Sequence, residues 1–162
     1  MTNNTMTGVA TDYPATDYPA TDYTATVAID ATPETVFEAL TTLQGLGSWW
    51  TSQVEGNATS GGRVTFKFGG GPNTFHVDET QPDVVRWTCE MAQLDEWPGT
   101  VVEFRLSPEA TGGTTLSFVH HGLTPKFVCY DECKSGWDYF LPSLRAYCET
   151  GVGTPWMAAS DS

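Results

Sequence analysis

The chain has 162 residues, of which 40% are hydrophobic and 17% charged, a composition typical of one globular domain rather than of a disordered chain. Twenty acidic residues against seven basic ones give a formal net charge of −13, which would repel nucleic-acid phosphates and anionic lipid surfaces, so we expect neither as a partner. No apolar run approaches the roughly 20 residues that a bilayer-spanning helix needs, which argues against membrane insertion.

The start of the chain carries a repeat rather than a targeting signal. Residues 1–10 lack the basic start and apolar stretch of a secretory signal, so we expect the protein in the cytoplasm. Because that compartment is reducing, the four cysteines are expected as free thiols rather than as two disulfides. Residues 10–24 read ATDYP, ATDYP and ATDYT, which predicts a disordered tail over residues 1–23. An alternative is that the tyrosines of this repeat are interaction or modification sites.

The folded domain is predicted to begin with a strand over residues 26–30 and a helix that starts at Pro33. Thr32 can cap this helix, and proline suits its first position because the missing N–H group needs no partner there. Apolar side chains then recur at helical spacing, and the helix is expected to end near Gly45. A second short helical turn over residues 46–50 carries two adjacent tryptophans.

Five strands are predicted in the middle of the chain, because runs of alternating apolar and polar residues are separated by glycine- and proline-rich turns. The turn spacing favours sequential antiparallel hairpins. One face of this sheet is apolar, and alternation places His120 on it while His121 points outward. Asp95 and Glu96 are expected at a hairpin tip. The predicted strands cover residues 63–68, 74–80, 84–90, 100–106 and 114–121.

The apolar face of the sheet needs a cover, and the C-terminal segment supplies it. From Cys129 to Cys148 apolar residues fall at steps of three and four, which is typical of a helix lying on a core. Gly151 is expected to end this helix, and Pro142 should bend it or make it locally irregular. The folded domain is therefore expected to span residues 24–153, with residues 154–162 as a flexible tail.

These elements also resemble a known superfamily. Residues 27–40 read VAIDATPETVFEAL and are followed by the Trp49-Trp50 pair. Shorter motifs follow along the chain: Gly61-Gly62, Val85-Arg86-Trp87, Trp97-Pro98-Gly99-Thr100, Gly113-Thr114-Thr115-Leu116, and Gly136-Trp137 before Leu141 and Leu144. In these residues the chain resembles START-like SRPBCC proteins, in the branch of homologues of the heat-shock chaperone ATPase activator and of polyketide cyclase/dehydrase-like proteins.

The resemblance implies an α+β helix-grip fold, in which a curved antiparallel β-sheet wraps around a long C-terminal α-helix and two short helices follow the first strand. The superfamily includes lipid and hormone carriers, cyclases, oxygenase subunits and chaperone regulators, so the resemblance implies a pocket and leaves its occupant open. No catalytic motif carries over to this chain.

We expect the pocket between the sheet and the C-terminal helix, with a small hydrophobic or aromatic molecule, lipid- or polyketide-like, as its ligand. The alternative is that the same large rings fill the core. The expected ligand-binding residues are Trp50, Phe66, Phe68, Trp87, Phe104, Phe118, His120, Cys133, Trp137 and Phe140.

His120 is the candidate catalytic residue, because an imidazole directed into an apolar pocket can act as a general acid or base near neutral pH. The alternative is a hydrogen-bonded core histidine. Cys129 and Cys133 stand one helical turn apart but lack a paired Cys-x-x-Cys motif, so we expect no metal, and the sequence indicates no cofactor.

Three functions stay open at this point. The first is a binding protein for a small hydrophobic molecule, and the second is a cyclase/dehydrase-type enzyme in which His120 moves protons. The third is a chaperone regulator, against which stands the short repeat before residue 24, where we expect no room for a further N-terminal domain. A homodimer is a further expected assembly.

Overall fold

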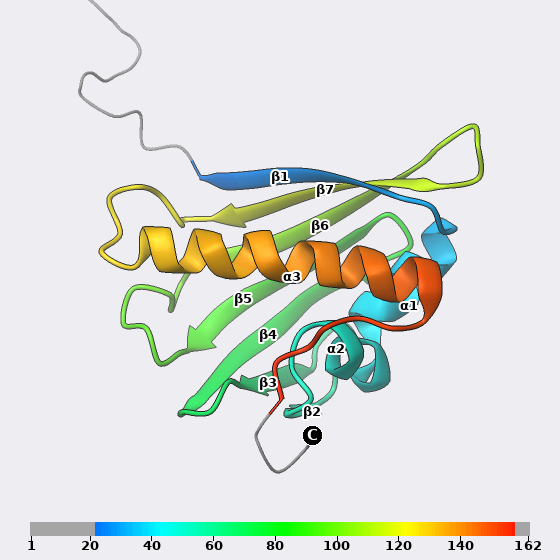
Figure 1. The fold of residues 1–162 in the computed structure, drawn as a ribbon. Helices are drawn as coiled ribbons and strands as arrows, with labels where there is room; N and C mark the ends of the chain where they lie inside the picture. Colours follow the sequence, from blue (N-terminus) through cyan, green and yellow to red (C-terminus); the bar gives the residue numbers. More distant parts are fainter. Residues whose placement is uncertain (1–21, 158–162) are drawn as a thin grey trace, which may run out of the picture.

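The computed structural model describes residues 22–157, so the repeat tail predicted over residues 1–23 lies almost entirely outside the described residues, as do residues 158–162. The elements follow the chain in the order shown in Figure 1: β1 (Tyr23–Ile29), α1 (Pro33–Thr41), α2 (Leu43–Trp49), β2 (Val54–Gly56), β3 (Arg63–Lys67), β4 (Pro72–Gln81), β5 (Val84–Met91), β6 (Val101–Pro108), β7 (Thr114–His121) and α3 (Tyr130–Thr150).

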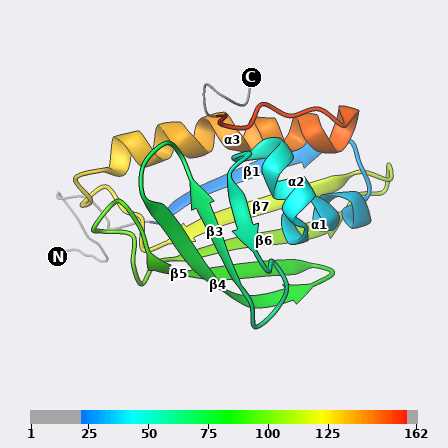
Figure 2. The same cartoon turned by 90° about the horizontal axis from the view of Figure 1, so that it is seen from below.

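The seven strands form one antiparallel sheet in the order β1-β7-β6-β5-β4-β3-β2. Strands β2 to β7 are consecutive neighbours, whereas β1 pairs with β7, with Tyr23 opposite His120 and Ile29 opposite Thr114. The sheet curves, α3 lies across its inner face, and α1 and α2 lie beside the C-terminal end of α3 (Figures 1 and 2). This is the α+β helix-grip fold that was predicted.

The two short helices divide their segment differently from the prediction. The first was expected to run to Gly45, but α1 ends at Thr41 and α2 begins at Leu43. The reason is Thr42, whose backbone is extended and whose Oγ1 accepts a hydrogen bond from the N–H group of Gly45 at 3.0 Å, so that it caps α2. A Cβ atom on Gly45 would lie 2.7 Å from the Cα atom of Ala39, so this glycine lets the helices pack closely.

All five predicted strands are present, with ends within two residues of the prediction, and β7 has the predicted bounds. The three-residue strand β2 was not predicted, because a segment this short has no measurable alternation. Inward and outward faces follow the alternation: His120 is fully buried, and the His121 side chain is partly exposed.

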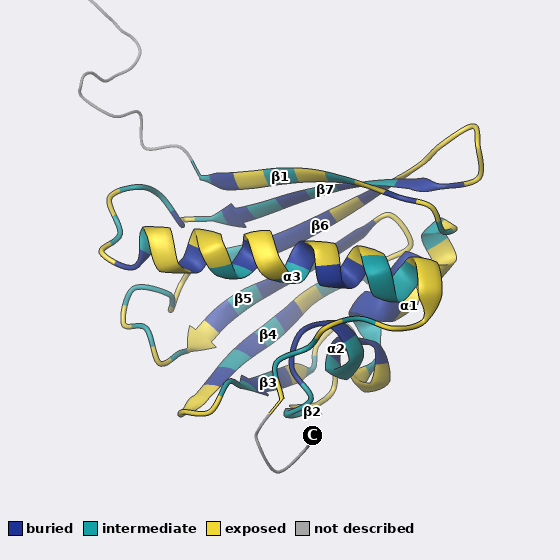
Figure 3. Cartoon of the chain, viewed as in Figure 1, coloured by how far each residue is buried: buried dark blue, intermediate teal, exposed yellow. Residues whose placement is uncertain are grey.

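The long helix covers the inner face of the sheet with one side, as the burial colours of Figure 3 show. Its buried residues are Cys133, Trp137, Leu141, Ser143 and Leu144. The helix runs across Pro142 without a break and ends at Gly151, which has a positive φ of 87° and donates its N–H group to the Tyr147 carbonyl at 2.8 Å. No helix in residues 22–157 combines the length and the apolar character that crossing a membrane requires.

The segment after α3 is described as far as Met157. It returns toward α2, where the Trp156 N–H group donates to the Trp50 carbonyl at 2.8 Å and the Thr154 N–H group donates to Ser143 Oγ at 2.7 Å. The first residues of the segment predicted as a tail are thus hydrogen-bonded to the domain.

Candidate functional site

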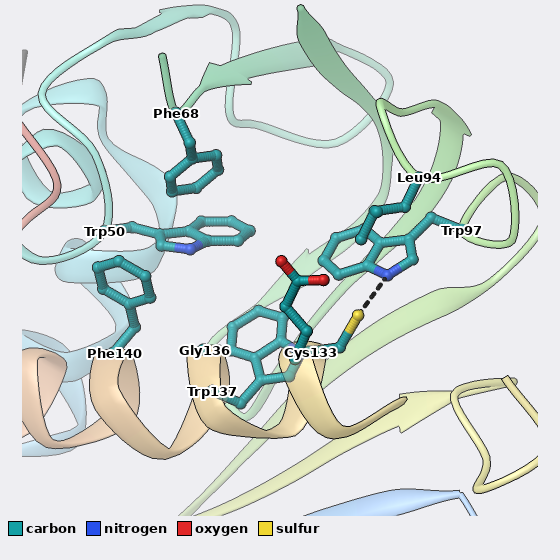
Figure 4. Close-up of a pocket in the computed structure, with 9 residues that line it drawn as sticks. Trp50, Phe68, Leu94, Trp97, Cys133, Gly136, Trp137 and Phe140 are labelled. Atoms are coloured by element: carbon teal, nitrogen blue, oxygen red, sulfur yellow. Dashed lines mark hydrogen bonds between the residues drawn. The ribbon is translucent and has the colours of Figure 1, made fainter. Parts of the chain in front are cut away.

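An apolar pocket of about 180 Å³ lies between the N-terminal half of α3, the end of β3 and the loop that joins β5 to β6 (Figure 4). Five of its nine lining residues carry aromatic rings, and Glu132 is the one charged residue among them. The lining residues are Trp50, Phe68, Leu94, Trp97, Glu132, Cys133, Gly136, Trp137 and Phe140.

A second hollow of about 330 Å³ adjoins this pocket. The two share Phe68, Leu94, Trp97 and Glu132, and the outer hollow adds the polar side chains of Asn73 and Gln93. The site therefore has an apolar inner part and a more polar outer part, with the glutamate in the lining of both.

Trp50 forms one wall of the inner pocket and is held on several sides. Its backbone N–H group donates to the Leu46 carbonyl at 3.0 Å, so it closes the last turn of α2. Its ring is nearly parallel to that of Trp87, with centroids 5.9 Å apart, and lies 4.2 Å from the Phe66 ring and 5.1 Å from the Trp137 ring. The wall is fixed because Trp50 is 97% buried in this aromatic cluster.

Two further walls, Trp97 and Trp137, are joined behind the pocket by a chain of hydrogen bonds through His120. The Trp137 indole N–H group donates to His120 Nδ1 at 3.1 Å. Because an indole only donates, Nδ1 is the acceptor and Nε2 carries the proton, which it donates to Thr100 Oγ1 at 2.9 Å. The Thr100 hydroxyl in turn donates to the Trp97 carbonyl at 2.6 Å.

The environment of His120 keeps its ring neutral. Burial, and to a smaller extent the neighbouring His121, lowers the pKa of His120 from 6.5 to about 3. Both ring nitrogens are engaged by protein groups, and the residue does not line the pocket. These contacts match the alternative of a hydrogen-bonded core histidine, and general acid or base catalysis by His120 stays a prediction.

The structure brings together half of the predicted ligand-binding residues. Trp50, Phe68, Cys133, Trp137 and Phe140 line the pocket. The other five lie in the core around it, where each is fully buried: Phe66, Trp87, Phe104, Phe118 and His120. Alternation along the strands put these side chains on the inner face, but it does not tell which of them meet free space.

Four lining residues were not predicted: Leu94, Trp97, Glu132 and Gly136. The first two belong to the loop between β5 and β6, and periodicity carries no information on where a loop folds. A signal for Gly136 was available, since a glycine inside an apolar helical stripe weakens the helix and needs a reason.

Glu96 holds this loop against α3. As expected, it lies in the loop of a hairpin, the one between β5 and β6. Its carboxylate accepts hydrogen bonds from the N–H groups of Val128 and Cys129, at 3.1 and 3.2 Å, just before the first residue of the helix. Desolvation raises the pKa of Glu96, and the hydrogen bonds from Cys129 and Val128 outweigh it and lower this pKa below its usual value. The ionised carboxylate therefore fixes the loop that carries Trp97.

A pair of thiols lies at the edge of the pocket. Cys129 Sγ and Cys133 Sγ are 3.1 Å apart, and the Trp97 indole N–H group donates to Cys133 Sγ at 3.2 Å. All four cysteines are free, and burial raises the pKa of Cys129 to about 12 and that of Cys133 above its usual value. The pair is therefore protonated near neutral pH. Within residues 22–157 no group of three or more metal-ligating side chains is present.

Comparison with known proteins gives one family match. Residues 30–149 match the model of the family described as activator of Hsp90 ATPase homolog 1-like protein. A search of curated proteins found no match.

Several solved structures share the fold. The Aha1 dimer from Colwellia psychrerythraea is 30% identical with a TM-score of 0.74, over 82% of this chain and 99% of that one. Protein MLL2253 from Mesorhizobium loti is 27% identical with a TM-score of 0.64, over 76% of this chain and 94% of that one. DynU16, a protein in the dynemicin biosynthetic locus, is 26% identical with a TM-score of 0.66, over 83% of this chain and 49% of that one.

Proposed function

Because the chain belongs to the family of activator of Hsp90 ATPase homolog 1-like proteins, within the SRPBCC superfamily, we propose that it binds a small hydrophobic or aromatic molecule in the pocket beside α3. The family and the polyketide cyclase-like branch of its neighbours fit a ligand-binding domain. The aromatic lining and the space inside it support the ligand class.

Gly136 is the observation that carries this proposal. It lies inside α3, where glycine costs about 0.5–1 kcal/mol relative to alanine. Its φ is not positive, and a Cβ atom there would meet no atom within 4 Å, so neither the backbone nor crowding requires a glycine. Gly136 lines the pocket, so the side chain that it lacks leaves space there.

The size of the pocket sets the size of the ligand group inside it. An engineered protein cavity of about 150 Å³ lined by apolar side chains binds benzene. The inner pocket, at about 180 Å³, therefore suits a ligand group of about one ring. The outer hollow beside Asn73 and Gln93 suits a more polar part of the same ligand.

Native mass spectrometry of freshly purified protein, followed by denaturation and extraction, tests the proposal. We expect a discrete small molecule to be released from the wild-type protein and from Gly136→Ala, which adds one methyl group. We expect none from Gly136→Leu, whose side chain fills the inner pocket. A wild-type protein that carries no molecule and takes up no hydrophobic dye would contradict the proposal.

The cyclase/dehydrase alternative needs a proton-transfer group that reaches the ligand. The contacts of His120 do not favour it, because a general acid or base must lie within hydrogen-bond reach of the substrate. Equal turnover by His120→Ala would remove this alternative.

We also propose that two copies of the chain associate in the cytoplasm. The Aha1 structure from Colwellia psychrerythraea is that of a dimer and covers 82% of this chain, which supports the association. The free thiols of all four cysteines are in keeping with a reducing compartment. Light scattering after size-exclusion chromatography tests the association, and a mass of 17.6 kDa at all concentrations would contradict it.

A further inference from the structure

We infer that the ligand is an organic cation, with an apolar body in the inner pocket and an ammonium group between the aromatic rings and the Glu132 carboxylate. This inference rests on the proposed function and adds the charge of the ligand to it.

The rings around the pocket present the first half of a cation site. Figure 4 shows Trp50, Phe68 and Phe140 on one side of the space and Trp97 on the other, with Trp137 below them on α3. The face of an aromatic ring carries negative partial charge, and a cation within about 6 Å of the ring centre is attracted to it, most strongly for tryptophan. Three of the five rings here are tryptophans.

Glu132 provides the second half. Its side chain lines both the inner pocket and the outer hollow, and within residues 22–157 it accepts no hydrogen bond and forms no ion pair. Two other carboxylates of this region are occupied, since Glu96 binds the backbone at the start of α3 and Asp138 binds Lys134 and the Tyr23 hydroxyl, and the neighbouring Asp131 lines neither hollow. Glu132 is therefore the carboxylate that remains available to a ligand.

The absence of basic groups sets the sign of the ligand charge. None of the seven lysines and arginines, all of which lie in the described residues, lines either hollow. A fatty acid or another anion would face the Glu132 carboxylate without a counter-charge, in a protein of net charge −13. A cation supplies the counter-charge that the protein lacks at this point.

Three probes of one-ring size separate charge from shape: benzylammonium, benzyl alcohol and benzoate. Binding to the full chain is followed by two-dimensional NMR through the indole N–H signals of Trp97 and Trp137. We expect benzylammonium to bind about five- to tenfold more tightly than benzyl alcohol, and benzoate most weakly. Raising the salt concentration should weaken the binding of benzylammonium but not that of the other two probes.

Glu132→Gln removes the charge and keeps the shape of the side chain. We expect it to remove most of the preference for benzylammonium over benzyl alcohol and to leave benzyl alcohol binding unchanged. Asp131→Asn is the matched control, because it neutralises the neighbouring exposed residue in the same turn of α3, outside the pocket lining, and should keep the preference.

The outcomes separate this inference from the proposed function. Equal binding of benzylammonium and benzyl alcohol, or a preference that survives Glu132→Gln, would overturn the cation inference while the pocket still binds apolar molecules. Binding of none of the three probes would overturn both.

Discussion

His120 is the residue whose surroundings make the sharpest prediction. Its pKa is about 3 in the folded protein and 6.5 in an unfolded chain, so below pH 6.5 the unfolded state takes up a proton that the folded state does not. The stability that depends on neutral His120 is therefore full above pH 6.5 and is lost as the pH falls toward 3, by about 1.4 kcal/mol per pH unit.

Urea unfolding at pH 7 and pH 5 measures this effect. We expect the wild-type protein to lose roughly 2 kcal/mol between the two conditions through this group. His120→Gln should be less stable at pH 7, since it disturbs the hydrogen bond of Trp137, yet it should lose much less on acidification. If the stability of His120→Gln fell between pH 7 and pH 5 as much as that of the wild type, the lowered pKa of His120 would not be the cause of the loss.

At this scale the sequence predicts which side chains face inward and does not predict their partners. Alternation along β7 was enough to bury His120, and helical spacing was enough to turn Trp137 toward the sheet. That these two rings share a hydrogen bond depends on how α3 is set over the sheet, which is a tertiary arrangement with no local signal.

At the scale of elements, α3 ends in a left-handed glycine cap and contains an interior glycine that weakens the helix. Replacing Gly136 with alanine should raise the free energy of unfolding by about 0.5–1 kcal/mol, because the space is free and alanine favours the helix. Gly151→Ala is the contrasting control and should lower it, because the φ of Gly151 is +87°. Urea midpoints report both changes. A destabilised Gly136→Ala protein would show that the pocket is not open at this point.

The loop between β5 and β6 should depend on the contact between Glu96 and the start of α3. In Glu96→Ala the N–H groups of Val128 and Cys129 lose their partner, so their hydrogen exchange should become faster and the urea midpoint should fall. Asp95→Ala, at the exposed neighbour, should leave both unchanged. Unaltered exchange in the Glu96 variant would mean that other contacts fix the loop.

Element boundaries were predictable where a cap or a turn has a residue signature. Thr32 and Gly151 were recognised for this reason, and both caps are present. The division between α1 and α2 was missed, because Thr42 caps α2 from within a run whose apolar spacing looks continuous. Here a single capping side chain overrides the periodicity.

For the whole molecule, many weak patterns agreed on the fold, since strand alternation, turn chemistry and the apolar face of the last helix all fit one curved sheet covered by one helix. Whether the core would be filled or hollow could not be predicted in this way. That outcome depends on the summed volumes of Trp50, Trp97, Trp137 and their neighbours, and on the loop that brings Trp97 over α3.

The most direct test of the central claim is a titration of the ¹⁵N-labelled protein with benzyl alcohol, followed through its six assigned tryptophan indole N–H signals. We predict saturable shifts for Trp50, Trp97 and Trp137, which line the pocket. The shift of Trp49 should be smaller, because this residue stacks on Trp50 but does not line the pocket, and its indole N–H group donates to the Ala39 carbonyl at 2.9 Å. Signals that stay unchanged, or that drift together without saturation, would contradict the account of a ligand pocket beside α3.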